Sequence, residues 1–137
     1  MKRLTAILLA LCACVMLVFT SCGDDDESKE IFDKWVDQIS GESKQPIYLT
    51  EEQIAESRTR INESFVTLKG EPMKGDIKKV AQIQKNKMFG YVLEFEYEDD
   101  AKIFYSLYEG REDENYYAKI SGRIVAYGNN PVIESLK

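Results

Sequence analysis

Two stretches in the first half of the chain carry apolar residues at helical spacing. The first predicts a helix that ends before Gly41, a residue type suited to the position just past a helix end, and its apolar residues are Ile31, Phe32, Trp35, Val36 and Ile39. A loop is expected from Gly41 to Leu49. The second stretch opens with Thr50 and Gln53, which have the form of a capping box, and predicts a helix from about Glu51 to Glu63.

From Asp76 onward the apolar period changes to two, which is the spacing of a β-strand. Ile77 to Gln84 predicts one strand, and Tyr91 to Glu98 shows the clearest alternation in the chain. In the second strand one face carries Tyr91, Leu93, Phe95 and Tyr97, and the other face carries Glu94, Glu96 and Glu98. This pattern predicts a strand that is buried on one face only, and the run Lys85 to Lys87 predicts a hairpin turn between the two strands.

The segment from Asp99 to Glu109 fits two structures. Its apolar residues match helical spacing and strand alternation equally well, but the aspartate at its start and Gly110 at its end favour a helix. Further on, Tyr116 to Ile120 and Arg123 to Tyr127 flank a Ser-Gly pair and predict a second hairpin. Residues 131–136 predict one last helical turn.

These elements predict a single α+β domain. Two N-terminal helices pack on an antiparallel sheet of about four strands, and a helix after Glu98 completes a β-α-β-β run that resembles half of a ferredoxin-like sandwich. The alternative is an all-β meander from Asp76 to Gly128, in which the ambiguous segment is a strand. A chain of 137 residues has room for one such domain and hardly for two.

The first residues of the chain have the pattern of a signal peptide. Lys2 and Arg3 form a short positive region, and a nearly pure apolar run follows from Leu4 to Phe19. As a helix this run would span about 24 Å, which is less than the hydrocarbon core of a bilayer at about 30 Å. A cleaved leader therefore fits better than a membrane-spanning anchor.

The end of the leader resembles a bacterial lipobox. Phe19-Thr20-Ser21-Cys22 places small residues before a cysteine, and the resemblance implies that Cys22 carries diacylglycerol and becomes the first residue of the mature chain. Cys14 ends a competing match, Leu11-Cys12-Ala13-Cys14. Cleavage there would leave a very short apolar run and keep an apolar segment in the mature protein, so we prefer Cys22. The remaining alternative is an uncleaved signal anchor.

An acidic run directly follows this cysteine. Asp24, Asp25, Asp26 and Glu27 are similar to the export signal of Bacteroidetes-type surface lipoproteins. The resemblance implies a protein held in the outer membrane by its lipid and facing the cell exterior, with the periplasmic leaflet of that membrane as the alternative. It covers residues 1–30 only, and we recognise no family in the body. We divide the chain into a signal peptide (1–21), an acidic tether (22–30) and one domain (31–137).

Composition narrows the chemistry of the domain. The chain has no histidine, so Ser-His and Cys-His catalytic pairs and histidine metal sites are excluded. Acidic side chains outnumber basic ones 24 to 18, which argues against nucleic acid as a partner. Removal of the leader takes away Lys2 and Arg3 and no acidic residue, so the net charge moves from −6 to about −8. We expect no metal and no cofactor.

Three patterns invite a chemical interpretation, and each has a simpler one. Glu94, Glu96 and Glu98 could form a carboxylate pair of the glycosidase kind, but they more readily form the solvated face of a strand. The glycines at positions 70 and 75 have the spacing of a phosphate-binding loop, but Asp76 replaces the lysine that such a loop needs. Residues 111–115 are rich in oxygen ligands, yet lack the spacing of a calcium loop.

Tyrosine is concentrated in the second half of the chain. Seven of the eight tyrosines lie between Tyr91 and Tyr127, and Tyr117 is the best candidate for an exposed ring that binds a partner. We therefore expect a non-catalytic, membrane-anchored surface lipoprotein that binds an envelope protein or a glycan as an accessory subunit. The alternatives are an inhibitor or immunity-type lipoprotein and a hydrolase that uses the strand glutamates.

Overall fold

The computed structural model describes residues 26–41 and 46–137 of the chain. Residues 26–40 form a helix, called helix 26–40 below. The elements that follow it are β1 (Ile47–Tyr48), α2 (Glu51–Lys69), β2 (Ile77–Lys85), β3 (Met88–Phe95), α3 (Glu98–Ser106), η1 (Glu112–Glu114), β4 (Tyr117–Ser121), β5 (Ile124–Gly128) and η2 (Pro131–Ser135), where η marks a 3₁₀-helix. Residues 26–30 are already helical, so the folded domain begins before residue 31, inside the segment assigned to the tether.

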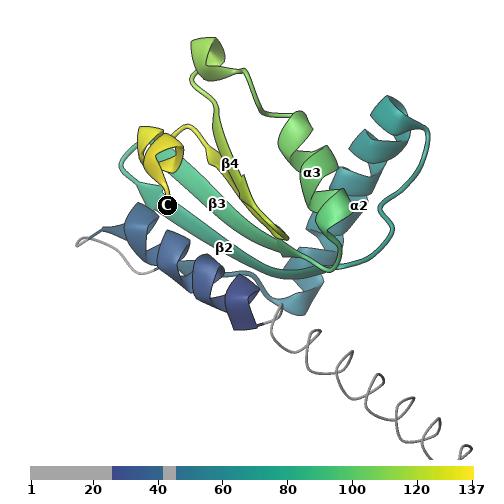
Figure 1. Cartoon of the computed structure of the whole chain (residues 1–137), viewed down its shortest axis with the longest axis horizontal. Coiled ribbons are helices and arrows are strands. Elements are labelled where there is room, and N and C mark those ends of the chain that lie inside the picture. Colours follow the sequence, from purple (N-terminus) through teal and green to yellow (C-terminus); the bar gives the residue numbers. More distant parts are fainter. Residues whose placement is uncertain (1–25, 42–45) are drawn as a thin grey trace, which may run out of the picture.

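Five strands form one sheet in the order β1-β2-β3-β5-β4, and every neighbouring pair is antiparallel (Figure 1). Because β5 is antiparallel to both of its neighbours, β3 and β4 run parallel to each other, and α3 connects them. A strand inserted between two parallel strands is the arrangement in half of a ferredoxin-like sandwich. The predicted α+β class is therefore confirmed, and the all-β alternative is wrong because residues 98–106 form α3.

The sheet has one strand more than the sequence predicts. β1 lies in the expected loop, where Ile47 pairs with Gln82 and Tyr48 pairs with Ala81 of β2. Two paired residues are too few to show a period in the sequence. Both predicted hairpins are present, and they join β2 to β3 and β4 to β5.

Helix α2 begins where the capping box predicts. The Gln53 backbone N–H donates to Thr50 Oγ1 at 3.3 Å, and the Thr50 backbone N–H donates to Gln53 Oε1 at 3.0 Å. The helix continues to Lys69, six residues beyond the predicted end at Glu63, because Phe65 still packs into the core. It ends at Gly70, which adopts the left-handed conformation with φ +76°.

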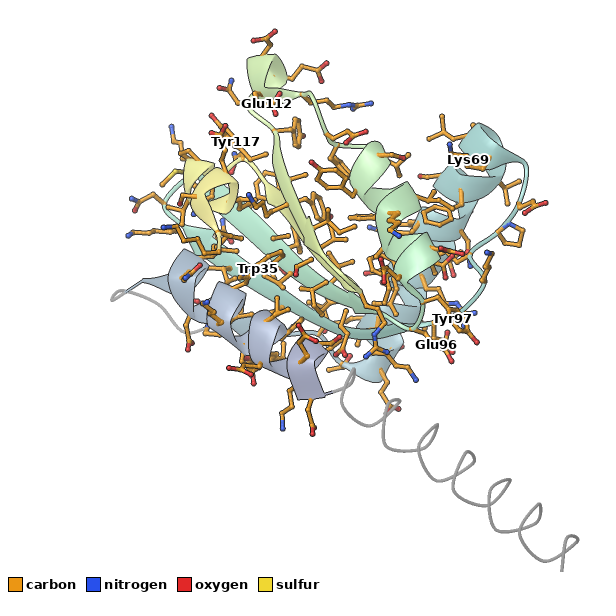
Figure 2. The ribbon with its side chains drawn as sticks, in the orientation of Figure 1. Trp35, Lys69, Glu96, Tyr97, Glu112 and Tyr117 are labelled. Atoms are coloured by element: carbon orange, nitrogen blue, oxygen red, sulfur yellow. The ribbon has the colours of Figure 1, made fainter. Side chains whose placement is uncertain are left out.

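Helices cover both faces of the sheet. One face packs against helix 26–40 and η2, through Phe32, Trp35, Val36, Ile39, Ile133 and Leu136. Figure 2 shows Trp35 between helix 26–40 and the strands. The other face packs against α2 and α3, through Phe65, Ala101 and Phe104. The molecule therefore has three layers with a separate apolar core on each side of the sheet.

This arrangement corrects the prediction for the strand from Tyr91 to Glu98. Val92 is 0% exposed on the face of helix 26–40, and Leu93 is 3% exposed on the face of α2 and α3, so both faces of β3 are buried. The strand also ends at Phe95. Glu96 and Tyr97 form a bend, and Glu98 begins α3.

The connection between α2 and β2 is held by side-chain oxygens. The buried Asp100 carboxylate accepts hydrogen bonds from the backbone N–H groups of Lys74 and Gly75, both at 3.0 Å. On either side, Met73 N–H donates to Asn62 Oδ1 at 2.9 Å, and Asp76 N–H donates to Glu96 Oε2 at 2.8 Å. Four successive N–H groups of this connection are thus satisfied by three side chains.

Gly75 lies against the bend that follows β3. A Cβ atom at this position would lie 2.5 Å from the Tyr97 ring and 2.6 Å from Glu96 Oε2. The Tyr97 ring therefore packs directly over the glycine backbone, and a larger residue at position 75 would displace it. Asp99, the aspartate expected to cap α3, does not do so: Tyr97 is the N-cap without a side-chain bond, and Asp99 lies inside the helix and pairs with Lys74.

We predict that Asp100→Ala destabilises the fold by about 3 kcal/mol, because two backbone N–H groups lose a charged acceptor in a poorly solvated place. Asp100→Asn keeps one acceptor oxygen and should cost about half as much. Urea unfolding followed by circular dichroism measures both values. Asp99→Ala is the matched control, because Asp99 forms only an exposed ion pair with Lys74. An Asp100→Ala midpoint equal to that of Asp99→Ala would contradict the role assigned to the buried carboxylate.

Candidate functional site

A groove of about 270 Å³ lies between α2 and α3, with strands of the sheet at its base. Its apolar lining comes from Leu49, Ile61, Val80, Leu93 and Phe104. Its hydroxyl groups come from Ser57, Ser64, Tyr91, Tyr108 and Tyr127. Arg60 of α2 supplies the charge. A concave, largely apolar site with a few polar groups is the usual form of a ligand-binding site.

The groove exists because α2 packs sparsely against the sheet. Phe65 is the one buried residue of this helix, and Ile54 and Ile61 are half-buried. Ser57 and Ser64 lie at helical spacing on the side that faces the groove, where larger apolar residues would fill it. Their hydroxyls donate to the carbonyl oxygens of Gln53 and Arg60, at 2.9 and 3.3 Å, so their oxygens remain able to accept.

Three tyrosine rings stack along the groove. Tyr91 and Tyr127 have centroids 5.1 Å apart and planes 17° apart, and Tyr108 and Tyr127 have centroids 4.6 Å apart and planes 25° apart. Tyr127 is covered on both ring faces, so it can offer a ligand only its edge and its hydroxyl. Phe104 meets the edge of Tyr127 at 5.2 Å and anchors the stack in the core.

The same aromatic cluster extends toward the loop that contains η1. Tyr116 lies 6.4 Å from both Tyr108 and Phe89. Tyr117, the ring singled out in the sequence, is half-buried and packs against the opposite core, on the face of helix 26–40. It therefore lies outside the groove (Figure 2).

Burial keeps the hydroxyls of Tyr108 and Tyr127 protonated. Burial raises the pKa of Tyr127 well above its usual value, and the neighbouring tyrosines add to this effect. Burial also raises the pKa of Tyr108, partly offset by Arg111. Both groups are neutral hydrogen-bond donors over the whole physiological range. In the described part of the chain, no hydrogen bond to a protein group occupies the hydroxyls of Tyr91, Tyr108 or Tyr127.

The three glutamates proposed as a catalytic set do not share one strand face. Glu94 lies in β3, and its side chain does not line the groove. Glu96 accepts the Asp76 N–H, and Glu98 forms an ion pair with Lys102 at 2.8 Å. The expectation of a solvated row is wrong as well, because these residues belong to a strand, a bend and a helix.

A second hollow lies on the surface near Tyr97. It is lined by Lys74, Tyr97, Glu98 and Asp99, and its volume is about 540 Å³. The charges of Lys74 and Asp99 already neutralise each other at 2.8 Å. This hollow therefore offers a ligand fewer charged or hydrogen-bonding groups without a protein partner than the groove does.

Several residues named in the sequence fall elsewhere. Cys22, Asp24 and Asp25 lie outside the described residues, and Asp26 and Glu27 are the first two described positions, both exposed on helix 26–40. The acidic segment at positions 112–114 forms the exposed turn η1, at the tip marked by Glu112 in Figure 2. Over residues 26–41 and 46–137, no group of three or more acidic or cysteine side chains could hold a metal ion. No helix in these ranges is long and apolar enough to cross a bilayer.

Comparisons with known protein families, with curated proteins and with solved structures each found no match. The candidate site therefore depends on the groove geometry alone.

Sequence reasoning indicated a cluster of tyrosines but neither the three that line this groove nor its helical wall. The concentration of tyrosine after residue 90 includes Tyr91, Tyr108 and Tyr127, but the ring singled out was Tyr117, which lies outside the groove. The positions 57, 60 and 64 repeat at helical spacing on α2, but serine and arginine on an exposed helix are ordinary. Only their placement opposite the rings makes them part of a site.

We predict that the stability of the protein falls as the pH rises above about 10, and that Tyr127→Phe reduces this loss. The folded state holds the Tyr127 proton more tightly than the unfolded state does. Below about pH 10 both states are protonated and stability is full; above it the unfolded state ionises first and is favoured. Urea midpoints measured from pH 8 to 11 test this sign.

Tyr48→Phe is the control for that experiment, because Tyr48 lies on β1 outside the aromatic cluster. It should lose stability with pH as steeply as the wild type. Equal pH dependence in Tyr127→Phe and in the wild type would show that burial of this hydroxyl does not hold its proton.

Proposed function

We propose that this protein is a non-catalytic lipoprotein that is anchored in the outer membrane, faces the cell exterior and binds a glycan in the groove between α2 and α3. It would act as the ligand-binding accessory subunit of a larger envelope assembly. The observation that carries the proposal is the stack of Tyr91, Tyr127 and Tyr108 along one groove, opposite two serines.

The chemistry of the lining supports a sugar as the ligand. A sugar presents carbon-bound hydrogens on its ring faces and hydroxyls at its rim, so it needs apolar surface beside hydrogen-bonding groups. The groove offers both: aromatic and aliphatic side chains beneath, and free tyrosine hydroxyls with serine oxygens beside them. Serine oxygens accept, while tyrosine hydroxyls donate and accept, which suits the mixed character of sugar hydroxyls.

The size of the groove supports a sugar over a folded protein. A volume of about 270 Å³ lies just below the range for small-ligand sites, which begins at about 300 Å³, so the groove suits a small ligand. A stable protein interface needs about 800 Å² on each partner, a much broader surface than a groove of this size. One or two sugar units at the end or in the middle of a chain fit these dimensions better.

The anchor supports a role at the cell surface. The leader, the Phe19–Cys22 lipobox and the acidic run that follows it belong to the resemblance to surface lipoproteins. A lipid on Cys22 would hold the domain at the membrane, since each buried CH₂ contributes about 0.8 kcal/mol. A glycan-binding domain held there would retain soluble or particulate glycans from the medium.

We predict that Ser64→Trp lowers glycan affinity at least about tenfold, because an indole at this position fills the groove. Binding of the detergent-solubilised full chain to a panel of immobilised neutral and acidic polysaccharides measures the effect. Thr59→Trp is the matched control: Thr59 is an exposed hydroxyl residue on another side of α2 and likewise bonds a carbonyl four residues back.

The Thr59→Trp variant should bind like the wild type, and both variants should unfold at similar urea concentrations. Equal binding by the two variants would show that the groove is not the glycan-binding site. A wild-type chain that binds no polysaccharide of the panel would overturn the glycan-binding function itself.

We predict that Cys22→Ala abolishes incorporation of labelled palmitate and releases the protein from the membrane fraction, because this change removes the sulfur that carries the lipid. Cys14→Ala is the matched control and should keep both the label and the membrane association. Protease added to intact cells should cleave the wild type. Retention of Cys22→Ala in the membrane would favour an uncleaved signal anchor, and protection of the wild type would place it in the periplasmic leaflet.

A further inference from the structure

The charge of the groove differs from the charge of the chain. The chain carries a net charge of −6, yet among the described residues that line the groove Arg60 is the sole charged one. No carboxylate of residues 26–41 or 46–137 contributes to the lining. The acidic surface repels a negative group, whereas the Arg60 guanidinium attracts one, so the groove is a place on this protein where a ligand with a negative group can bind.

Arg60 is available for this contact. It is exposed on α2, and in the part of the chain that the structure describes it forms no ion pair within 4.0 Å. Glu56 and Glu63 lie one helical turn away on either side, at positions that could have paired with it. The nearby Arg58, by contrast, is held by an ion pair with Asp76.

The chemistry of arginine indicates which kind of negative group the ligand carries. A planar guanidinium binds a carboxylate through two parallel hydrogen bonds, which fixes the orientation of the ligand as well as its charge. The neutral tyrosine hydroxyls on the opposite side can donate further hydrogen bonds to the same ligand. The combination of aromatic surface, hydroxyls and one guanidinium matches a sugar ring that bears a carboxylate.

We propose that the groove binds an acidic glycan, with the carboxylate of a uronic acid unit paired to the Arg60 guanidinium and its hydroxyls bonded to the hydroxyls of the stacked tyrosines. This inference rests on the proposed glycan-binding function and names the class of glycan. It requires no metal, because the guanidinium itself neutralises the carboxylate.

The test compares ligands that differ only in charge. Binding of the detergent-solubilised full chain is measured to polygalacturonate and to alginate, each beside its esterified form, and to a neutral β-glucan. We expect at least one uronate polymer to bind, and we expect esterification to lower its affinity about tenfold or more. Raising the salt concentration should weaken binding of the acidic polymer and leave any binding of the esterified form nearly unchanged.

Matched variants assign the effect to Arg60. Arg60→Gln should remove the preference for the free acid over the ester, whereas Lys69→Gln should keep it. Lys69 lies at the far end of the same helix, as Figure 2 shows, and is not part of the groove lining. Both substitutions remove one positive charge from α2, so a general charge effect would change both variants equally.

Each outcome separates the two proposals. Binding of the neutral glucan, or equal binding of acid and ester, would overturn the proposal that the glycan is acidic. The proposal that the groove binds a glycan would remain. No binding to any polysaccharide would overturn both. Binding of poly-glutamate in an Arg60-dependent manner, without binding of any glycan, would also overturn both and indicate an acidic protein partner.

Discussion

The hydrogen bonds from Lys74 and Gly75 to the Asp100 carboxylate join the end of one helix to the start of another. Helix α2 contributes a single buried side chain, so apolar packing alone leaves its distance from α3 weakly determined. The buried carboxylate belongs to α3 and holds the connection that follows α2, and Asn62 Oδ1 of α2 accepts from Met73 in the same connection. The two helices that flank the groove are therefore tied to each other through this connection.

Local signals in the sequence predicted most of the elements. The capping box at Thr50 and the two hairpin turns are each set by residues close together in the chain, so they could be recognised without tertiary information. The end of β3 could not. Alternation continues through Tyr97, but the chain bends after Phe95 and the Tyr97 ring packs over Gly75, twenty-two positions earlier.

The candidate site was harder to predict than the fold because its parts come from distant segments. Tyrosine clustering indicated an aromatic site, yet the choice among seven rings depended on which face of the sheet each one occupies. Tyr117 lies on one face and Tyr127 on the other, although both are on neighbouring strands. Arg60 became notable only when the fold placed it beside rings that follow it by thirty residues or more.

Helix 26–40 has a mechanical consequence that follows from its packing. It supplies Trp35 to one core, its indole N–H donates to the Lys137 carbonyl at 3.2 Å, and Arg123 donates to Ser28 Oγ at 3.2 Å near the start of the helix. If Cys22 carries the proposed lipid and the groove holds the proposed glycan, tension between the membrane and that glycan would load this helix from residue 26. The contacts of this helix would then break one after another, starting from residue 26. The groove lies on the opposite face of the sheet, so it would still bind the ligand after the first of these contacts had broken.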